Sequence, residues 1–224
     1  MNTEIARFNM IEQQIRPWEV LDQAVLSLLA SVRREDFLPP ALRALAFVDT
    51  QVPLLEGQTT GPCMLEPKVE ARLLQALQLR RHESVLEIGA GSGFMAALLA
   101  HHAMHVTSLE CRPVLVHRAR ENLRRNGVIN ARVLEVTAAE GARGLASEAP
   151  FDAILLSGSV AEVPRALLAQ LKPGGRLAAV VGHEPVMRAR LYTRANAAAC
   201  SEVDLFDTVA PRLEGFDEPS RFRF

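Results

Sequence analysis

The sequence has 224 residues, of which 49% are hydrophobic and only 5% are aromatic, so we expect an aliphatic core within one compact domain. The formal net charge is −1, from 25 basic and 26 acidic residues. This balance lacks the basic excess that nucleic-acid-binding and membrane-surface proteins usually carry. We therefore expect no nucleic-acid partner and no membrane contact.

The three cysteines, Cys63, Cys111 and Cys200, are far apart in the sequence and form no Cys-x-x-Cys pair. Such spacing predicts reduced thiols and a cytoplasmic protein. The first residues carry charge where a signal peptide requires an apolar stretch, and no apolar run reaches membrane-spanning length. The sequence makes no prediction of the oligomeric state.

Two amphipathic helices are predicted at the start of the chain. The first ends at Arg16-Pro17, because the residue before a proline avoids the helical conformation. Asp22 is the expected N-cap of the second helix. Prolines and glycines recur in residues 37–62, which predicts an irregular region, and a loop of this length usually serves binding. The apolar face expected on the first helix consists of Ile5, Phe8, Ile11 and Ile15.

From Pro67 onward, short apolar strands alternate with helical stretches. This alternation predicts an α/β fold, with a doubly wound, mostly parallel, Rossmann-like sheet that helices cover on both faces. The helices before Pro67 form an N-terminal extension. Five strands are expected at residues 84–88, 105–109, 132–136, 151–156 and 176–181, with two further β-segments near residues 191–194 and 203–209.

The segment Glu87-Ile88-Gly89-Ala90-Gly91-Ser92-Gly93 joins a predicted strand to a predicted helix. Gly89 permits the tight turn, while Gly91 and Gly93 remove side chains where the backbone must approach a ligand. Glu110 stands at the end of the next strand, about 20 residues further on, where an acidic side chain hydrogen-bonds ribose hydroxyls. The pattern therefore predicts a nucleoside-containing cofactor.

Two residues decide which cofactor is expected. A dinucleotide fingerprint requires glycine at the position of Phe94, and the carboxylate of Glu87 would repel a pyrophosphate. S-adenosylmethionine carries a sulfonium and an ammonium but no phosphate, so an acidic residue favours it. We therefore predict S-adenosyl-L-methionine as the cofactor and S-adenosyl-L-homocysteine as the product left behind.

The sequence resembles the protein-L-isoaspartate O-methyltransferases over nearly the whole chain. Residues 85–94 match the family's cofactor loop, and Arg34-Glu35-Asp36-Phe37-Leu38-Pro39 matches its R-E-x-F-x-P segment. Gly57-Gln58-Thr59 matches the start of the substrate loop. Later landmarks, shared with many methyltransferases, are residues 151–154 and 171–177.

The resemblance implies a methyltransferase of the class I, Rossmann-like fold that acts in protein repair. Residues 1–224 would form a single domain, with the N-terminal helices and substrate loop in residues 1–66 and the cofactor-binding core in residues 67–224. The methyl acceptor would be the carboxylate of a damaged aspartyl residue in a peptide or protein. A carboxylate is already a nucleophile, so no general base is expected.

The sequence departs from the family pattern at two places. The loop from Gly57 to Pro62 is one residue shorter than in the family and lacks its serine, so Thr59 and Thr60 are expected to supply the hydroxyl that orients the acceptor. The family's acidic residue after the third strand is also absent. Thr137 and the backbone of Ala138 are expected to contact the adenine there.

The predicted site divides into two groups. The expected catalytic residues are Thr59 and Thr60. No metal site is expected, because His101, His102 and His105 cluster without a cysteine or aspartate that would complete a tetrahedral ligand set. The expected cofactor-binding residues are Glu87, Gly89, Ala90, Gly91, Gly93, Glu110, Thr137 and Ala138.

Other functions remain open on the sequence. The same scaffold could methylate a small-molecule acceptor, or it could be a catalytically silent S-adenosylmethionine-binding protein. A nicotinamide-dependent oxidoreductase is disfavoured by the same features that disfavour a dinucleotide. Nucleic-acid methylation is disfavoured because Ser157-Gly158-Ser159-Val160 lacks the prolines and the aromatic ring of the adenine methyltransferase motif.

Overall fold

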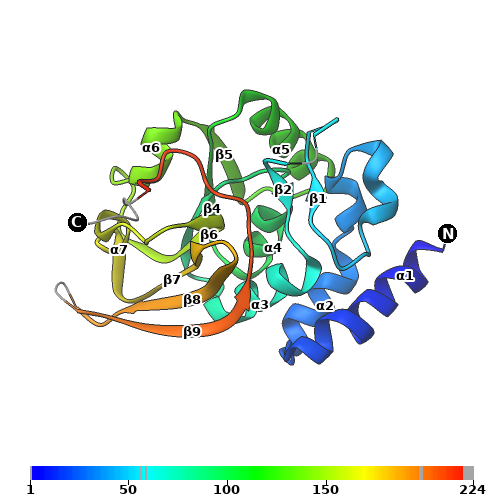
Figure 1. Cartoon of the computed structure of the whole chain (residues 1–224), viewed down its shortest axis with the longest axis horizontal. Coiled ribbons are helices and arrows are strands. Elements are labelled where there is room, and N and C mark those ends of the chain that lie inside the picture. Colours follow the sequence, from blue (N-terminus) through cyan, green and yellow to red (C-terminus); the bar gives the residue numbers. More distant parts are fainter. Residues whose placement is uncertain (1, 56, 59, 197–198, 219–224) are drawn as a thin grey trace.

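A seven-stranded sheet forms the centre of the computed structural model, which describes residues 2–55, 57–58, 60–196 and 199–218. The strand order is β5-β4-β3-β6-β7-β8-β9 (Figure 1). The first five strands in this order run parallel, and β8 and β9 join antiparallel. This confirms the predicted mostly parallel α/β fold. The strands are β3 Ser84–Ile88, β4 His105–Glu110, β5 Ala131–Glu135, β6 Phe151–Val160, β7 Leu171–His183, β8 Val186–Arg194 and β9 Cys200–Thr208.

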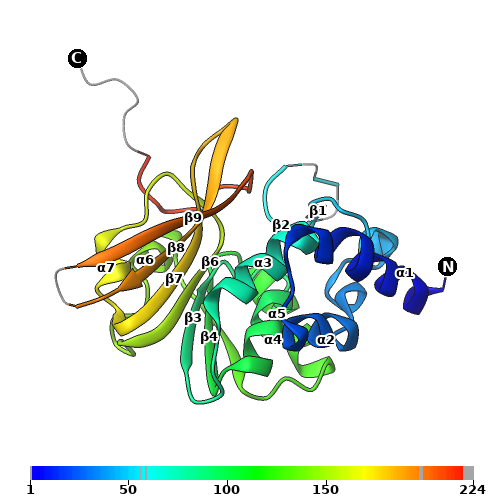
Figure 2. The same ribbon diagram turned by 90° about the horizontal axis from the view of Figure 1, so that it is seen from below.

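Helices pack on both faces of the sheet and bury two separate apolar clusters (Figure 2). In β3 the side chains alternate, so that Val85 enters one cluster while Leu86 and Ile88 enter the other. The first cluster lies against α3, α4 and α5, and the second against α7. The helices of the core are α3 Pro67–Leu77, α4 Phe94–His102, α5 Pro113–Arg125, α6 Ala138–Arg143 and α7 Arg165–Leu168.

The N-terminal extension continues the first apolar cluster. Asp22 caps α2 as predicted, since its side chain accepts a hydrogen bond from the N–H of Ala24. The apolar face expected on the first helix is only half right, because Ile5 and Phe8 are exposed while Ile11 and Ile15 are buried. The extension consists of α1 Thr3–Met10, the helical turns η1 Ile11–Ile15 and η2 Arg16–Trp18, α2 Gln23–Ser31, and the 3-10 turns η3 Arg34–Phe37 and η4 Pro40–Leu45.

Two features of the strands differ from the sequence prediction. The region expected to be irregular, residues 37–62, contains the short strand β1 (Val52–Pro53), which pairs antiparallel with β2 (Cys63–Met64) just after it. The strand expected at residues 176–181 is longer than predicted, because residues 171–175 also belong to β7. The pairing of β7 with β6 shifts in register between Leu171 and Arg176, so the residues between them form a bulge within the strand and β7 begins at Leu171.

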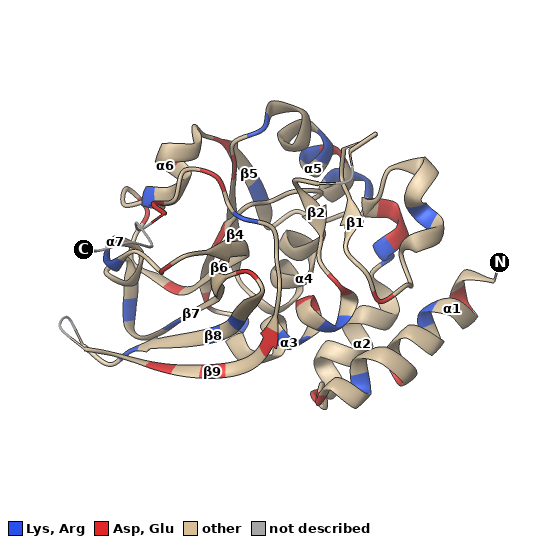
Figure 3. Ribbon diagram, viewed as in Figure 1, with Lys and Arg blue, Asp and Glu red and all other residues tan. Residues whose placement is uncertain are grey.

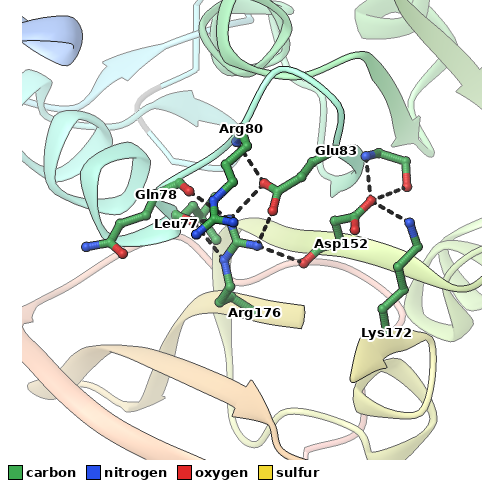
Figure 4. A network of polar contacts seen from close by, with 8 residues as sticks. Leu77, Gln78, Arg80, Glu83, Asp152, Lys172 and Arg176 are labelled. Carbon is green, nitrogen blue, oxygen red and sulfur yellow. Dashed lines mark hydrogen bonds and ion pairs between the residues drawn. The ribbon is translucent and has the colours of Figure 1, made fainter. Parts of the chain in front are cut away.

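A polar network ties α3, β3, β6 and β7 together (Figure 4). The guanidinium of Arg176 donates to the carbonyl of Leu77 and to both carboxylate oxygens of Glu83. Asp152 accepts hydrogen bonds from Ser84 and from the ammonium of Lys172. The network lies where β3, β6 and β7 begin, at the end of the sheet opposite the glycine loop. It therefore stabilises the fold and does not contact that loop.

Charged residues of both signs are interspersed over the helices and strands (Figure 3).

Among the described residues, the structure contains no helix with the length and apolarity needed to span a bilayer.

Candidate active site

The glycine loop follows β3 and turns back into α4. Gly89 has a φ of +92°, and a Cβ placed on it would lie 2.8 Å from the side chain of Leu213. Gly93 has a φ of +83°, and its Cβ would lie 3.1 Å from the backbone oxygen of Ala119 in α5. Both positions combine a left-handed backbone with close contact, which only glycine accepts without strain. The tight turn at Gly89 is therefore as predicted, whereas Gly93 is required by the close approach of α5 and not by a ligand.

Glu110 ends β4 and shapes the same loop. Its carboxylate accepts hydrogen bonds from the N–H of Gly91 at 2.9 Å and from the N–H of Arg112 at 3.0 Å. The side chain is almost fully buried, yet it lines the cavity described next. Glu110 therefore holds the loop after β3 and the loop after β4 in one arrangement.

A cavity, here the main cavity, lies beyond the carboxyl ends of β3, β4 and β6. Gly89, Gly91 and Glu110 form one side of it, and Ala138 with Gly141 forms another. Ligands bind at this edge in sheets whose strand order reverses, as it does here between β3 and β6. The structure thus brings four of the predicted cofactor-binding residues, Gly89, Gly91, Glu110 and Ala138, around one hollow.

A smaller hollow, here the inner cavity, adjoins the main one and shares Gly89 and Gly91 with it. Glu87 and Ala90 line the inner cavity. The carboxylate of Glu87 is fully buried and accepts hydrogen bonds from the hydroxyls of Ser108 at 2.6 Å and Ser157 at 2.7 Å. Burial raises the pKa of Glu87 to about 7, although these two hydrogen bonds oppose the rise.

A buried ion pair supports the inner cavity from outside the predicted site. Arg34 in η3 donates to the carboxylate of Glu70 in α3 and to the carbonyl of Leu65, and its guanidinium lies 5.0 Å from the ring centre of Phe94. Glu70 lines the inner cavity. Burial raises the pKa of Glu70 to about 7, with Arg34 acting in the opposite direction. Arg34 belongs to a motif that was recognised in the sequence, but its ion pair with Glu70 was not predicted.

Three other predicted residues, Thr60, Thr137 and Gly93, line neither the main cavity nor the inner cavity. Thr59 falls outside the described residues. Thr60 is exposed and lines a third hollow, the outer hollow, which shares Gly61, Pro62, Cys63, Pro211 and Arg212 with the main cavity. Thr137 is not among the lining residues, because its hydroxyl is engaged with Glu140 in a capping box at the start of α6. Gly93 lines neither cavity and instead packs against α5.

The segment after β9, residues 209–218, forms a C-terminal strap over the strand ends (Figure 1). The N–H of Ser159 donates to the carbonyl of Pro211 at 2.8 Å, and the N–H of Leu213 donates to the carbonyl of Ser159 at 2.9 Å. Glu214 pairs with Arg112 on the opposite wall. The strap therefore contributes a wall of the main cavity that sequence reasoning missed, since nothing in its composition marks it.

Comparison with known proteins identifies the family. A model of the protein-L-isoaspartate(D-aspartate) O-methyltransferase family matches residues 6–208, which include both the glycine loop and the region around β1 and β2. The chain belongs to this family. Membership confirms the resemblance seen in the sequence, the O-methyltransferase class and S-adenosylmethionine as the methyl donor.

Individual relatives agree with the family match. A protein-L-isoaspartate O-methyltransferase from Methanoculleus marisnigri is 42% identical over 176 residues, covering 79% of this chain and 77% of the relative. Another from Myxococcus xanthus is 43% identical over 163 residues, covering 73% of this chain and 74% of the relative.

Solved structures agree on the fold. A Plasmodium falciparum structure described as a protein-L-isoaspartate O-methyltransferase in complex with S-adenosyl-L-homocysteine superposes with a TM-score of 0.76. The match covers 96% of this chain and 99% of the other, at 20% identity. The doubly wound methyltransferase fold predicted from the sequence is thereby confirmed.

Proposed function

We propose that this protein transfers the methyl group of S-adenosylmethionine to the carboxylate of an isoaspartyl residue in a damaged peptide or protein, as a step of protein repair. The observation that carries the proposal is the family match over residues 6–208, because it spans the substrate-loop region as well as the cofactor loop. The three cysteines are unpaired thiols, which supports the cytoplasm as the place of action.

The whole chain is proposed to act as a single domain. Residues 1–66 supply one wall of the main cavity through Leu54 and Leu65, and residues 67–224 supply the rest. One continuous apolar cluster contains residues of both parts, from Met10 in α1 to Ala210 after β9. A shared core of this kind supports joint folding of the two parts.

The residues around the two cavities fit S-adenosylmethionine, which supplies an electrophilic methyl group on a positively charged sulfur. Glu110 is proposed to accept the ribose hydroxyls, and the backbone from Gly89 to Gly93 to form the cradle. Glu87, in the inner cavity, is proposed to face the cationic end of the methyl donor. Ala138, with Thr137 before it, is proposed to bound the adenine.

The methyl transfer requires the protein to align the acceptor oxygen with the methyl carbon, and it requires no proton transfer. The acceptor oxygen attacks the methyl carbon at a distance of about 3 Å, the carbon–sulfur bond breaks with its electron pair on sulfur, and a neutral methyl ester and thioether remain. Two opposite charges are neutralised in this step, so a site closed to water favours it. The substrate loop and the strap cover the cavity, and Thr59 and Thr60 are proposed to orient the acceptor.

An assay with paired peptides tests the proposal. The pure protein is incubated with labelled S-adenosylmethionine and either an isoaspartyl peptide or its normal aspartyl counterpart. We expect base-labile methyl ester on the isoaspartyl peptide alone. Equal absence of ester on both peptides, with S-adenosylhomocysteine still bound in calorimetry, would favour a small-molecule acceptor or a silent binding protein.

The affinity for the methyl donor should depend on pH through Glu87. Because the pKa of this buried carboxyl is raised to about 7, it is largely protonated at pH 6 and ionised at pH 8, and a cationic ligand prefers the ionised form. We expect the ratio of wild-type to Glu87→Gln affinity to rise about tenfold from pH 6 to pH 8. Calorimetry of both proteins measures this ratio, in which titration of the ligand itself cancels. A ratio that stays constant would contradict the role of Glu87.

A further inference from the structure

Arg212 stands in the strap at the place where the main cavity meets the outer hollow, because it lines both. Its guanidinium lies against the ends of β6 and β7, with 3.0 Å to the carbonyl of Gly182, 3.2 Å to Nδ1 of His183 and 3.4 Å to the hydroxyl of Ser159. None of these three groups carries a full negative charge. These three neutral contacts therefore position the guanidinium without neutralising its charge.

A carboxylate already occupies this place. Glu218, further along the same strap, puts one oxygen 2.5 Å from Nε of Arg212 and the other 3.6 Å from Nδ1 of His183. The side chain of Glu218 is 51% exposed, so it can leave without opening the core. The structure thus shows that Arg212 binds a carboxylate at this position, and that the carboxylate belongs to a surface residue that a ligand can displace.

The substrate loop offers two threonine hydroxyls, which are proposed to orient the acceptor, but no positive charge. It contains no serine, and Thr60 is exposed on the outer hollow. The other arginine of the main cavity, Arg112, also pairs with a glutamate of the strap, Glu214, but unlike Arg212 it does not line the outer hollow. A guanidinium offers several N–H donors in one plane and binds a carboxylate more strongly than a single hydroxyl does.

We propose that Arg212 binds the reacting carboxylate of the methyl acceptor in the place of Glu218, and so selects anionic acceptors. The inference rests on the proposed function, because it names the group that receives the substrate of that reaction. Arg212 lies beyond the residues 6–208 that the family model matches. One acceptor oxygen takes the N–H groups of Arg212, and the other remains free to attack the methyl carbon.

The test compares five proteins: the wild type, Arg212→Gln, Arg212→Lys, Glu218→Gln and the control Arg188→Gln. Arg188 also holds an exposed ion pair, with Asp204 in β9, but lines none of the three hollows. We expect Arg212→Gln to raise the KM for an isoaspartyl peptide about tenfold or more and Arg212→Lys to recover part of the loss. Glu218→Gln should lower the KM because a competing carboxylate is gone, and the control should match the wild type.

Binding measurements separate this inference from the proposed function. Calorimetry gives the affinity of each protein for S-adenosylhomocysteine and, with that ligand saturating, for the isoaspartyl peptide. Unchanged S-adenosylhomocysteine affinity with weakened peptide binding in Arg212→Gln supports the inference, even if the wild type forms no ester and the proposed function fails. An unchanged KM and peptide affinity in Arg212→Gln would overturn it, as would an equal loss of S-adenosylhomocysteine affinity or a wild type that binds no peptide.

Discussion

Replacing Glu110 with alanine is expected to weaken binding of S-adenosylhomocysteine by about a hundredfold, while the protein stays folded. The wild-type carboxylate accepts the N–H groups of Gly91 and Arg112 and so fixes the two loops that border the main cavity. The same carboxylate is the proposed partner of the ribose. Its removal therefore costs direct hydrogen bonds to the ligand and also releases the loops that shape the cavity.

Calorimetric titration of the purified variant measures this loss, and circular dichroism checks the fold. Glu135→Ala is a matched control, because Glu135 is the register neighbour of Glu110 at the end of β5 but is exposed and lines neither cavity. The control should bind as the wild type does. A Glu110→Ala protein with undiminished affinity would show that the ribose lies elsewhere.

Replacing Glu70 with alanine is expected to lower the free energy of unfolding by about 3–5 kcal/mol. The side chains of Arg34 and Glu70 are only 3% and 6% exposed, so the variant leaves a guanidinium buried without its carboxylate. The pair also joins η3 to α3, so its loss loosens the N-terminal extension on the core. Because burial raises the pKa of Glu70 to about 7, above its value in the unfolded chain, the folded protein holds the proton more tightly, and the loss should become smaller as the pH rises towards 7.

Urea unfolding at pH 5 and pH 8 measures the loss of stability and its dependence on pH. Glu121→Ala is the control, since Glu121 forms an exposed pair with Arg125 at 3.9 Å, and pairs of this kind contribute about 0–1 kcal/mol. The double variant Arg34→Met, Glu70→Leu should be more stable than Glu70→Ala, because it removes the unpaired charge as well. A Glu70→Ala protein as stable as the Glu121→Ala control would refute the account.

The sequence predicted those parts of the fold whose information is local. Short apolar runs placed the central strands, and Gly89, Gly91 and Glu110 line the main cavity, as the glycine pattern indicates. The exposure of Ile5 and Phe8 was not predictable, because a helical apolar face does not say whether another element covers it.

The parts of the site that were missed depend on contacts between distant residues. Arg34 and Glu70 are 36 positions apart, and Arg212 reaches the ends of β6 and β7 only because the strap follows the antiparallel strands back across the sheet. Thr137 reads as a ligand contact in the sequence, yet its hydroxyl serves the capping box of α6. A pattern of neighbouring residues predicts local structure only. A cavity wall formed by segments that are far apart in the sequence produces no such pattern.

The strap has a consequence for synthesis of the protein on the ribosome. One wall of the main cavity comes from Pro211, Leu213 and Glu214, which are made after every strand of the sheet. A nascent chain can therefore fold its sheet and glycine loop while the cavity is still open on one side. Binding of the methyl donor at full affinity should begin only when residues 209–216 have left the ribosome, after the sheet itself has been made.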